Sequence, residues 1–248
     1  MLTVTEVCQL KRDGFVAVVG AVPDTFCLPA LAALTAWHAR LDSDDERLWF
    51  RDQAPDSYGA PFWSELTRVT DSVAAALAES GRSWLLAPQL IGSPGGQATD
   101  PRARGWHIDT VEVARRDGFP TDPPEFPQFD LIVGVYLTDM TEPGSGYLNV
   151  WPGSHRVIAE RCAAEPDVRS FVPRLYAELA SEVRDPIPVL GPRGTLIVMN
   201  SFVAHDTTVN RSAQFSGRAY LRYAHEGIDR ATAWRSGNPW FGWKLAEE

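Results

Sequence analysis

Three side chains that can bind a metal lie in two short segments of the sequence. In WHIDT, His107 and Asp109 are separated by one residue, so in an extended chain both side chains point to the same face and can chelate one ion. His205 ends the strand-like run GTLIVMNSFVAH and offers a second imidazole. Two imidazoles and one carboxylate suit iron(II) and leave coordination positions open. The sequence therefore predicts an iron site rather than a closed, thiolate-rich zinc site.

The other three histidines fit structural roles better. His38 lies in the helical segment AWHARL, where we expect a packing or surface residue. His155 belongs to PGSHR, which has the composition of a turn after a strand. His225 follows RAYLRYA and either lines a pocket or caps an edge, with the structural role favoured.

A candidate anion anchor lies downstream of the last proposed ligand. Arg218 is 218 − 205 = 13 residues after His205 and opens the β-patterned run RAYLRY. A guanidinium offers two parallel donors to a carboxylate, which an anionic cosubstrate bound to iron by its other end would need. Arg222 shares the same strand face by period two and competes for this role.

The secondary-structure elements expected to position these residues are mainly helices in the first part of the chain and mainly strands in the second. Helical patterns dominate the first 83 residues, around the strand-like FVAVVG, and Thr3 and Glu6 have the spacing of a capping box. We expect a second helix from about Asp24 and a third over 61–82. Their predicted buried stripes are Leu28, Leu31, Leu34 and Leu41 in the second, and Leu66, Val69, Val73 and Leu77 in the third.

After Trp84 the sequence turns to short β-rich runs separated by Pro and Gly, which indicates a sandwich or barrel. A helical insertion is expected from about Val157 to Val183. The segment from Arg115 to Gln128 has four prolines, which oppose both helix and interior strand. The runs are WLLAPQLIG, FDLIVGVYL, GYLNVW, PIPVLG, GTLIVMNSFVAH and GRAYLRYAH.

Bulk composition narrows the class of protein. The 248 residues, 44% of them hydrophobic, suffice for one well-cored domain. No run reaches the length of a membrane span, and the charged N-terminus lacks the apolar run of a signal peptide, so we expect a soluble cytoplasmic protein. A net charge of −9 argues against a nucleic-acid partner. Cys8, Cys27 and Cys162 lack CxxC spacing and are expected to be core or surface residues.

Four segments together resemble the phytanoyl-CoA dioxygenase (PhyH) family of iron(II)- and 2-oxoglutarate-dependent oxygenases. They are WHIDT, EPGSGYLNVWPGSHR, GTLIVMNSFVAHDTTVNRS and GRAYLRY, in the family's order. The resemblance implies a mainly β fold with flanking helices, a cupin-like double-stranded β-helix or jelly roll. We expect a single domain over 1–248, with N-terminal helices in 1–83, the jelly-roll core in 84–225 and a C-terminal extension in 226–248.

Carried over by position, the resemblance makes His107, Asp109 and His205 the iron ligands. Arg218 would bind the distal carboxylate of 2-oxoglutarate. The implied cofactors are Fe(II), 2-oxoglutarate as cosubstrate and dioxygen, with ascorbate as a candidate stimulant.

Two further positions resemble family residues that touch the cosubstrate. Gln89 lies on the strand before WHIDT, and Thr207 is two residues beyond the distal histidine. The chain departs from the family pattern at Asp206, where a small residue is common, and in the spacing before Arg218, which leaves Arg222 open as the anchor.

The resemblance also indicates the reaction. Chlorinating relatives replace the metal-binding carboxylate with a small residue, and Asp109 is present, so hydroxylation of a C–H bond is the default. Desaturation, epoxidation and cyclisation by the same chemistry remain open. The expected substrate is a small metabolite, with secondary metabolism as a candidate context and with no nucleic-acid or membrane partner; the oligomeric state stays open.

The sequence does not decide which residues line the substrate pocket. It also does not decide whether the protein is a catalyst. The segment from Arg115 to Gln128 is a candidate lid. Aromatic walls could come from Trp106, Trp151, Tyr220 and the C-terminal WRSGNPWFGWK, although core positions are commoner for such residues. A non-catalytic jelly-roll binding protein is one alternative. A cupin-like iron enzyme that does not use 2-oxoglutarate is another, and it would leave Arg218 without a ligand.

Overall fold

Fourteen helices and strands are defined in the described part of a computed structural model, which covers residues 2–41, 50–52, 61–79, 83–97, 106–109, 129–164, 185–225, 227 and 229–245. They are α1 (Val4–Asp13), β1 (Phe15–Val18), α2 (Asp24–His38), β2 (Phe50–Asp52), α4 (Pro61–Leu77), β3 (Ser83–Ser93), β4 (Leu131–Tyr136), β5 (Leu148–Val150), α6 (Ser154–Ala164), β6 (Ile187–Val189), β7 (Leu196–Asn200), β8 (His205–Thr207), β9 (Ser216–His225) and α8 (Arg230–Arg235).

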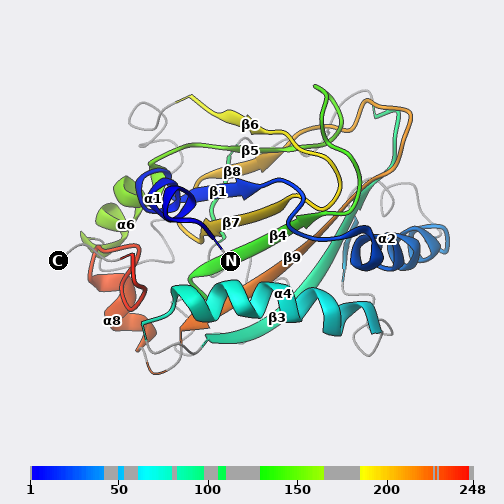
Figure 1. Cartoon of the computed structure of the whole chain (residues 1–248). Coiled ribbons are helices and arrows are strands. Elements are labelled where there is room, and N and C mark those ends of the chain that lie inside the picture. Colours follow the sequence, from blue (N-terminus) through cyan, green and yellow to red (C-terminus); the bar gives the residue numbers. More distant parts are fainter. Residues whose placement is uncertain are drawn as a thin grey trace.

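Two antiparallel sheets form the body of the protein (Figure 1). The larger sheet has six strands in the order β1-β7-β4-β9-β3-β2, and the smaller has three in the order β6-β5-β8. Helices α2 and α4 pack against β3 and β9 of the larger sheet. This arrangement confirms the mainly β, jelly-roll fold class. Strands β1 and β2 extend the larger sheet beyond the 84–225 range that the sequence assigned to the core.

Strand β9 is buried along its whole length because both of its faces are covered. One face carries Ala219, Leu221 and Tyr223, which join the core beneath α2 and α4. The other face carries Arg218, Tyr220 and Arg222, since side chains alternate along a strand. Two arginines are therefore carried into the interior between the sheets by the register of a central strand.

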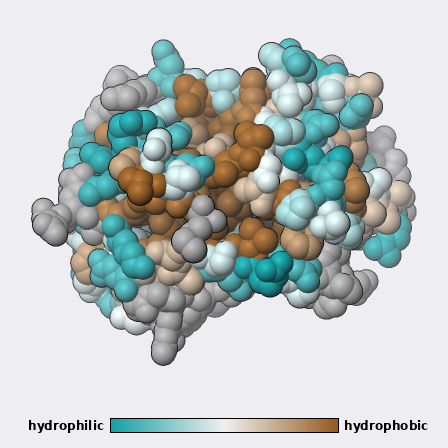
Figure 2. Space-filling view, viewed as in Figure 1, coloured by the Kyte–Doolittle hydropathy of each residue, from teal (hydrophilic) through white to brown (hydrophobic). Residues whose placement is uncertain are grey.

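The face of the molecule shown in Figure 2 is polar over its helices and apolar in a central hollow between α1 and α4. Among the described helices, none combines the length and apolar character that crossing a bilayer requires. The three cysteines form no disulfide, and Cys27 and Cys162 are buried while Cys8 is exposed. The expectation of core or surface cysteines is thus confirmed.

The helix patterns were right in position, but α4 ends at Leu77 rather than near Arg82, and one residue of the predicted α2 stripe is exposed. In α4, Leu66, Val73 and Leu77 are buried as expected. In α2 the buried residues are Cys27, Ala30 and Leu34, whereas Leu28 is 46% exposed. Leu31 and Leu34 lie against Gly217 of β9, where the strand has no side chain, and Leu28 alone of the predicted stripe is exposed.

The expected insertion over 157–183 begins earlier, since α6 starts at Ser154. Residues 165–183 lie outside the described part of the chain. His155 consequently lies in the first turn of a helix rather than in a loop.

Gly14 ends α1 and lies close to the side chains of His155 and Val203. The capping box of Thr3 and Glu6 starts the helix, and Gly14 ends it with φ 84°. A Cβ atom at this position would lie 2.5 Å from His155 Nδ1 and 2.7 Å from Val203 Cγ2. Both the left-handed backbone and the close approach of these two side chains require a glycine.

Replacing Gly14 by alanine should lower the free energy of unfolding by about 2 to 4 kcal/mol, because left-handed strain and overpacking add. Gly20→Ala is the matched control, since Gly20 has φ 69° but nothing within 4 Å of its Cβ position. Urea unfolding measures both. Equal losses in the two variants would show that backbone strain alone matters at Gly14.

His155 is a fully buried histidine outside the predicted metal site, which agrees with its expected structural role. Its Nε2 lies 3.3 Å from the Lys11 carbonyl oxygen, and its ring packs edge-on against Trp240. Burial lowers the pKa of His155 to about 4, with Arg156 adding to the effect and the Lys11 carbonyl and Asp13 opposing it.

The folded protein should therefore lose stability as the pH falls from about 6.5 towards 4, because unfolded His155 takes up a proton that the folded state rejects. Between pH 7 and 4.5 we expect His155→Gln to lose about 2 to 3 kcal/mol less than the wild type. Denaturant unfolding at both pH values gives the comparison. Parallel pH profiles for the two proteins would contradict a buried neutral imidazole.

Candidate metal centre

The two predicted histidine ligands lie directly opposite each other on antiparallel backbone. His107 donates its N–H to the His205 carbonyl at 2.9 Å, and His205 donates to the His107 carbonyl at 2.8 Å. Opposed residues in such a pair project to the same side of the sheet. The ring centroids are accordingly 4.3 Å apart. Backbone pairing thus brings together residues that are almost a hundred positions apart in the chain.

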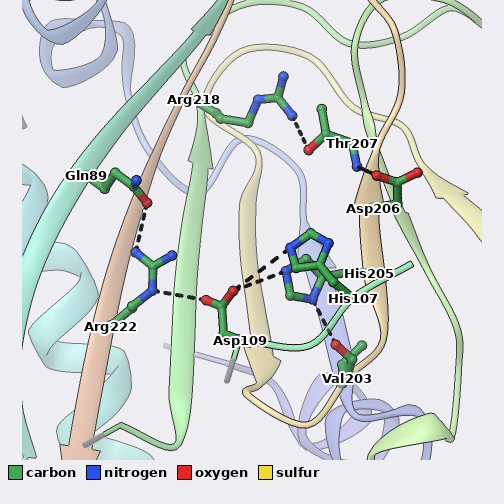
Figure 3. Close-up of polar contacts among 9 residues, drawn as sticks. All are labelled: Gln89, His107, Asp109, Val203, His205, Asp206, Thr207, Arg218 and Arg222. Carbon is green, nitrogen blue, oxygen red and sulfur yellow. Dashed lines mark hydrogen bonds and ion pairs between the residues drawn. The ribbon is translucent and has the colours of Figure 1, made fainter. Parts of the chain in front are cut away.

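Asp109 completes the group from the same face as His107, as its position two residues further on predicts. Its Oδ1 atom lies 4.0 Å from His107 Nε2 and 3.7 Å from His205 Nε2 (Figure 3). Two ligand atoms on one ion with bonds near 2.1 Å can be at most about 4.2 Å apart. Both separations meet that limit, and one ligand atom from each residue lies within 4.8 Å of the others. The three residues can hold one metal ion.

The histidine at the start of β8 is fixed in a metal-binding tautomer. His205 Nδ1 lies 2.8 Å from the Val203 carbonyl oxygen. A carbonyl only accepts, so Nδ1 carries the hydrogen and Nε2 keeps a free lone pair. This partner orients the ring as the outer hydrogen bonds of histidine ligands commonly do.

An apolar cluster packs next to the residues of the candidate metal site. Ile108, between two of the ligands, and Ala204, just before the third, pack with Trp234 of α8. Trp106 and Trp151 are partly buried against the same cluster. Of the aromatic residues that could have lined a pocket, Trp240 and Trp243 lie in the core, as the sequence favoured, whereas the buried Trp234 also lines a small cavity with Phe129 and Phe202. The candidate lid over 115–128 lies outside the described residues.

Arg222 binds the metal-site carboxylate rather than facing an empty cavity. Its Nε donates to Asp109 Oδ2 at 3.0 Å, and its Nη1 donates to Gln89 Oε1 at 2.9 Å. The guanidinium carbon lies 5.5 Å from the centre of the Phe129 ring. Burial opposes ionisation of Asp109, but its positive surroundings, above all the Arg222 guanidinium, outweigh burial and hold the pKa of Asp109 below its ordinary value.

Arg218 lies at the other end of the interior face of β9 and is fully buried. Its Nη1 donates to Thr207 Oγ1 at 2.9 Å, and its Nη2 lies 3.5 Å from Ser216 Oγ. Among the described residues, neither the Nε of Arg218 nor the hydroxyl of Tyr220 has a hydrogen-bond partner, and no carboxylate pairs with Arg218 there. A buried cation of this kind is costly unless an anion joins it.

The sequence pattern thus picked out the three residues that the structure brings together as a group able to hold a metal, and the structure separates the two competing arginines. Gln89 lies beside Arg222, and Thr207 lies beside Arg218. Asp206, which departs from the family pattern, accepts a hydrogen bond from the Thr207 backbone and is half-buried. Tyr220 was expected only as an aromatic wall; its polar end, which lies on the arginine face of β9, was not anticipated.

Solved structures show the same fold. The chain is similar to SnoK, a non-heme alpha ketoglutarate dependent carbocyclase from nogalamycin biosynthesis, with 13% identity, a TM-score of 0.65 and coverage of 90% of this chain and 84% of that one. It is similar to the epimerase SnoN, with 16% identity, a TM-score of 0.64 and coverage of 89% and 82%. It is also similar to EctD from S. alaskensis, with 21% identity, a TM-score of 0.59 and coverage of 90% of this chain and 77% of that one.

No curated protein sequence matches the chain significantly. A sequence profile, however, matches residues 10–219, and its family is described as Phytanoyl-CoA dioxygenase (PhyH). The matched region includes both segments that carry the triad. Because it spans most of the 248 residues, the chain belongs to the phytanoyl-CoA dioxygenase family of iron- and 2-oxoglutarate-dependent oxygenases.

Proposed function

We propose that this protein hydroxylates an unactivated C–H bond of a small metabolite, using iron(II) held by His107, Asp109 and His205. Membership of the family makes it an oxidoreductase that uses iron and 2-oxoglutarate. One observation carries the assignment of roles within the site. Arg218 is fully buried and has no carboxylate partner in the described chain, and it lies in the same interior as the group of His107, Asp109 and His205 that can hold a metal.

The fit to 2-oxoglutarate rests on the spacing of these groups. Thr207 is two residues beyond His205 on β8, a step of about 7 Å along a strand, and Arg218 contacts Thr207. A five-carbon dicarboxylate has an anionic group at each end, one for the metal and one for Arg218. The Nε of Arg218, which has no hydrogen-bond partner in the described part of the chain, supplies a further donor to the distal carboxylate.

Each residue has a defined task in this proposal. The triad holds the iron, which with 2-oxoglutarate and dioxygen supplies the oxidising power. Arg218 and Thr207 orient the cosubstrate. Burial raises the pKa of Tyr220, so its hydroxyl stays protonated and can donate. The surrounding apolar residues of β4, β5 and β7 exclude water, which strengthens every charge interaction in the site.

The outcome after hydrogen abstraction is proposed from Asp109. Because the carboxylate is present, hydroxylation is favoured over halogenation. The similar structures include an epimerase, a carbocyclase and an EctD complex that contains 5-hydroxyectoine. The same fold thus accommodates several outcomes, and desaturation, epoxidation or cyclisation of a secondary metabolite is the second candidate. We also propose that the chain acts as one domain in the cytoplasm.

Succinate formation tests the proposal. Purified protein with iron(II), 2-oxoglutarate and air is screened against a panel of small metabolites, with ascorbate present and absent. A product heavier by one oxygen that carries a new hydroxyl group supports hydroxylation. An epoxide of the same mass, or a product lighter by two hydrogens, supports the second candidate. Under anaerobic conditions, iron(II) and 2-oxoglutarate together should give a weak visible band. Neither band nor succinate with any compound would favour the non-catalytic binding protein.

A further inference from the structure

We infer that Arg222 is a positioning residue that holds Asp109 as a one-oxygen ligand, and that Gln89 supports Arg222 rather than the cosubstrate. The inference rests on the proposed metal site but not on the reaction catalysed there. It follows from which oxygen of Asp109 meets which partner.

The two carboxylate oxygens of Asp109 face different partners (Figure 3). Oδ1 faces the imidazoles, at 3.7 Å from His205 Nε2 and 4.0 Å from His107 Nε2. Oδ2 accepts the hydrogen bond from Arg222 Nε at 3.0 Å. An ion shared with both imidazoles therefore meets Oδ1, while Oδ2 is occupied by a guanidinium.

Arg222 is itself held in place on three sides. Its Nη1 donates to Gln89 Oε1 at 2.9 Å, its plane lies over Phe129, and its backbone belongs to the central strand β9. The side chains of Arg222 and Asp109 are only 6% and 4% exposed. At such burial the pair is weakly screened by salt and keeps one geometry.

This geometry affects the number of open coordination positions. A carboxylate can bind a cation through one oxygen or through both. If Asp109 bound through both, it would take a position that cosubstrate or dioxygen needs. The hydrogen bond from Arg222 occupies Oδ2 and fixes the orientation of the carboxylate, and thereby keeps Asp109 to one position.

The same contacts argue against Arg222 as the cosubstrate anchor. Two of its donors are used by Asp109 and Gln89. The Nε of Arg218 has no partner among the residues that the structure describes. The two arginines therefore divide the work, with Arg218 for the distal carboxylate and Arg222 for the metal ligand.

Cobalt(II) titration of the purified protein, followed by visible absorption, tests the inference without turnover. Arg222→Gln should weaken cobalt binding by about 10- to 100-fold, as loss of an outer partner of a metal ligand does, and should change the absorption intensity, which reports coordination number. Arg222→Lys, which keeps the charge, should recover part of the affinity. The matched variant Arg218→Gln should leave cobalt affinity and spectrum unchanged and weaken 2-oxoglutarate binding instead.

Gln89→Leu covers the case in which Arg222→Gln does not fold. It leaves the arginine in place and removes only its support, so cobalt affinity should fall by a few-fold while 2-oxoglutarate affinity of the cobalt protein stays the same. Unchanged cobalt affinity in folded Arg222→Gln, or in Gln89→Leu if the arginine variant is unfolded, would overturn the inference. Failure of the wild type to bind cobalt would instead refute the metal site, and normal cobalt binding without turnover would refute only the proposed reaction.

Discussion

His205→Ala is expected to lose iron binding and all 2-oxoglutarate turnover. The substitution removes one of three ligands, so the loss of iron affinity should exceed the roughly 100-fold upper value for an outer-sphere change. The backbone pairing with His107 does not depend on the side chain, so the fold should persist. Anaerobic iron(II) titration measures affinity, and succinate release measures turnover.

His225→Ala is the matched control for this variant. His205 and His225 are both 7% exposed and both lie on strands of the body. His225 packs edge-on against Trp243 and is not part of the group that can hold a metal. Its replacement should reduce stability but keep iron affinity. Equal iron affinity in the two variants would show that the triad is not the metal site.

Local patterns were enough to predict most of the elements that carry the site. The capping box of Thr3 and Glu6 gave the start of α1, and alternation in RAYLRY placed Arg218 and Arg222 on one face of a strand. WHIDT gave two of the three residues in the group that can hold a metal, because a separation of two residues settles their common face without any tertiary information. Such signals are short-range and survive in a single sequence.

The partners of these residues could not be predicted in the same way. Arg222 and Asp109 are 113 positions apart, and Asp109 lies on the segment in which His107 pairs with His205 of β8, not on a neighbour of β9. Which arginine reaches the carboxylate therefore depends on how this segment lies over the interior face of β9, which no local pattern indicates. The exposure of Leu28 in α2 was likewise decided by tertiary packing. Trp240 and Trp243 became core residues because the C-terminal segment returns to the helices, which no periodicity indicates.

Arg218→Met should raise the KM for 2-oxoglutarate at least about 30-fold, since losing one partner of a buried charge pair costs about 2 kcal/mol or more. Thr207→Val, which removes the hydroxyl that contacts Arg218, should raise it only several-fold. Arg211→Gln is the control, because Arg211 is exposed in the turn before β9. Steady-state kinetics with varied 2-oxoglutarate gives the three values, and an unchanged KM in Arg218→Met would show that another residue anchors the distal carboxylate.

Stability of the ligand-free protein distinguishes a binding role for Arg218 from a structural one. An arginine that supports the fold would leave a destabilised protein when replaced. Arg218 is instead a buried cation with no carboxylate beside it in the described chain, so the hydroxyls of Thr207 and Ser216 offset its desolvation only in part until an anion binds. Without ligand, Arg218→Met should therefore be more stable than the wild type by about 1 kcal/mol. Added 2-oxoglutarate and a non-reactive divalent metal should reverse that order in thermal unfolding, because only the wild type gains from binding the cosubstrate.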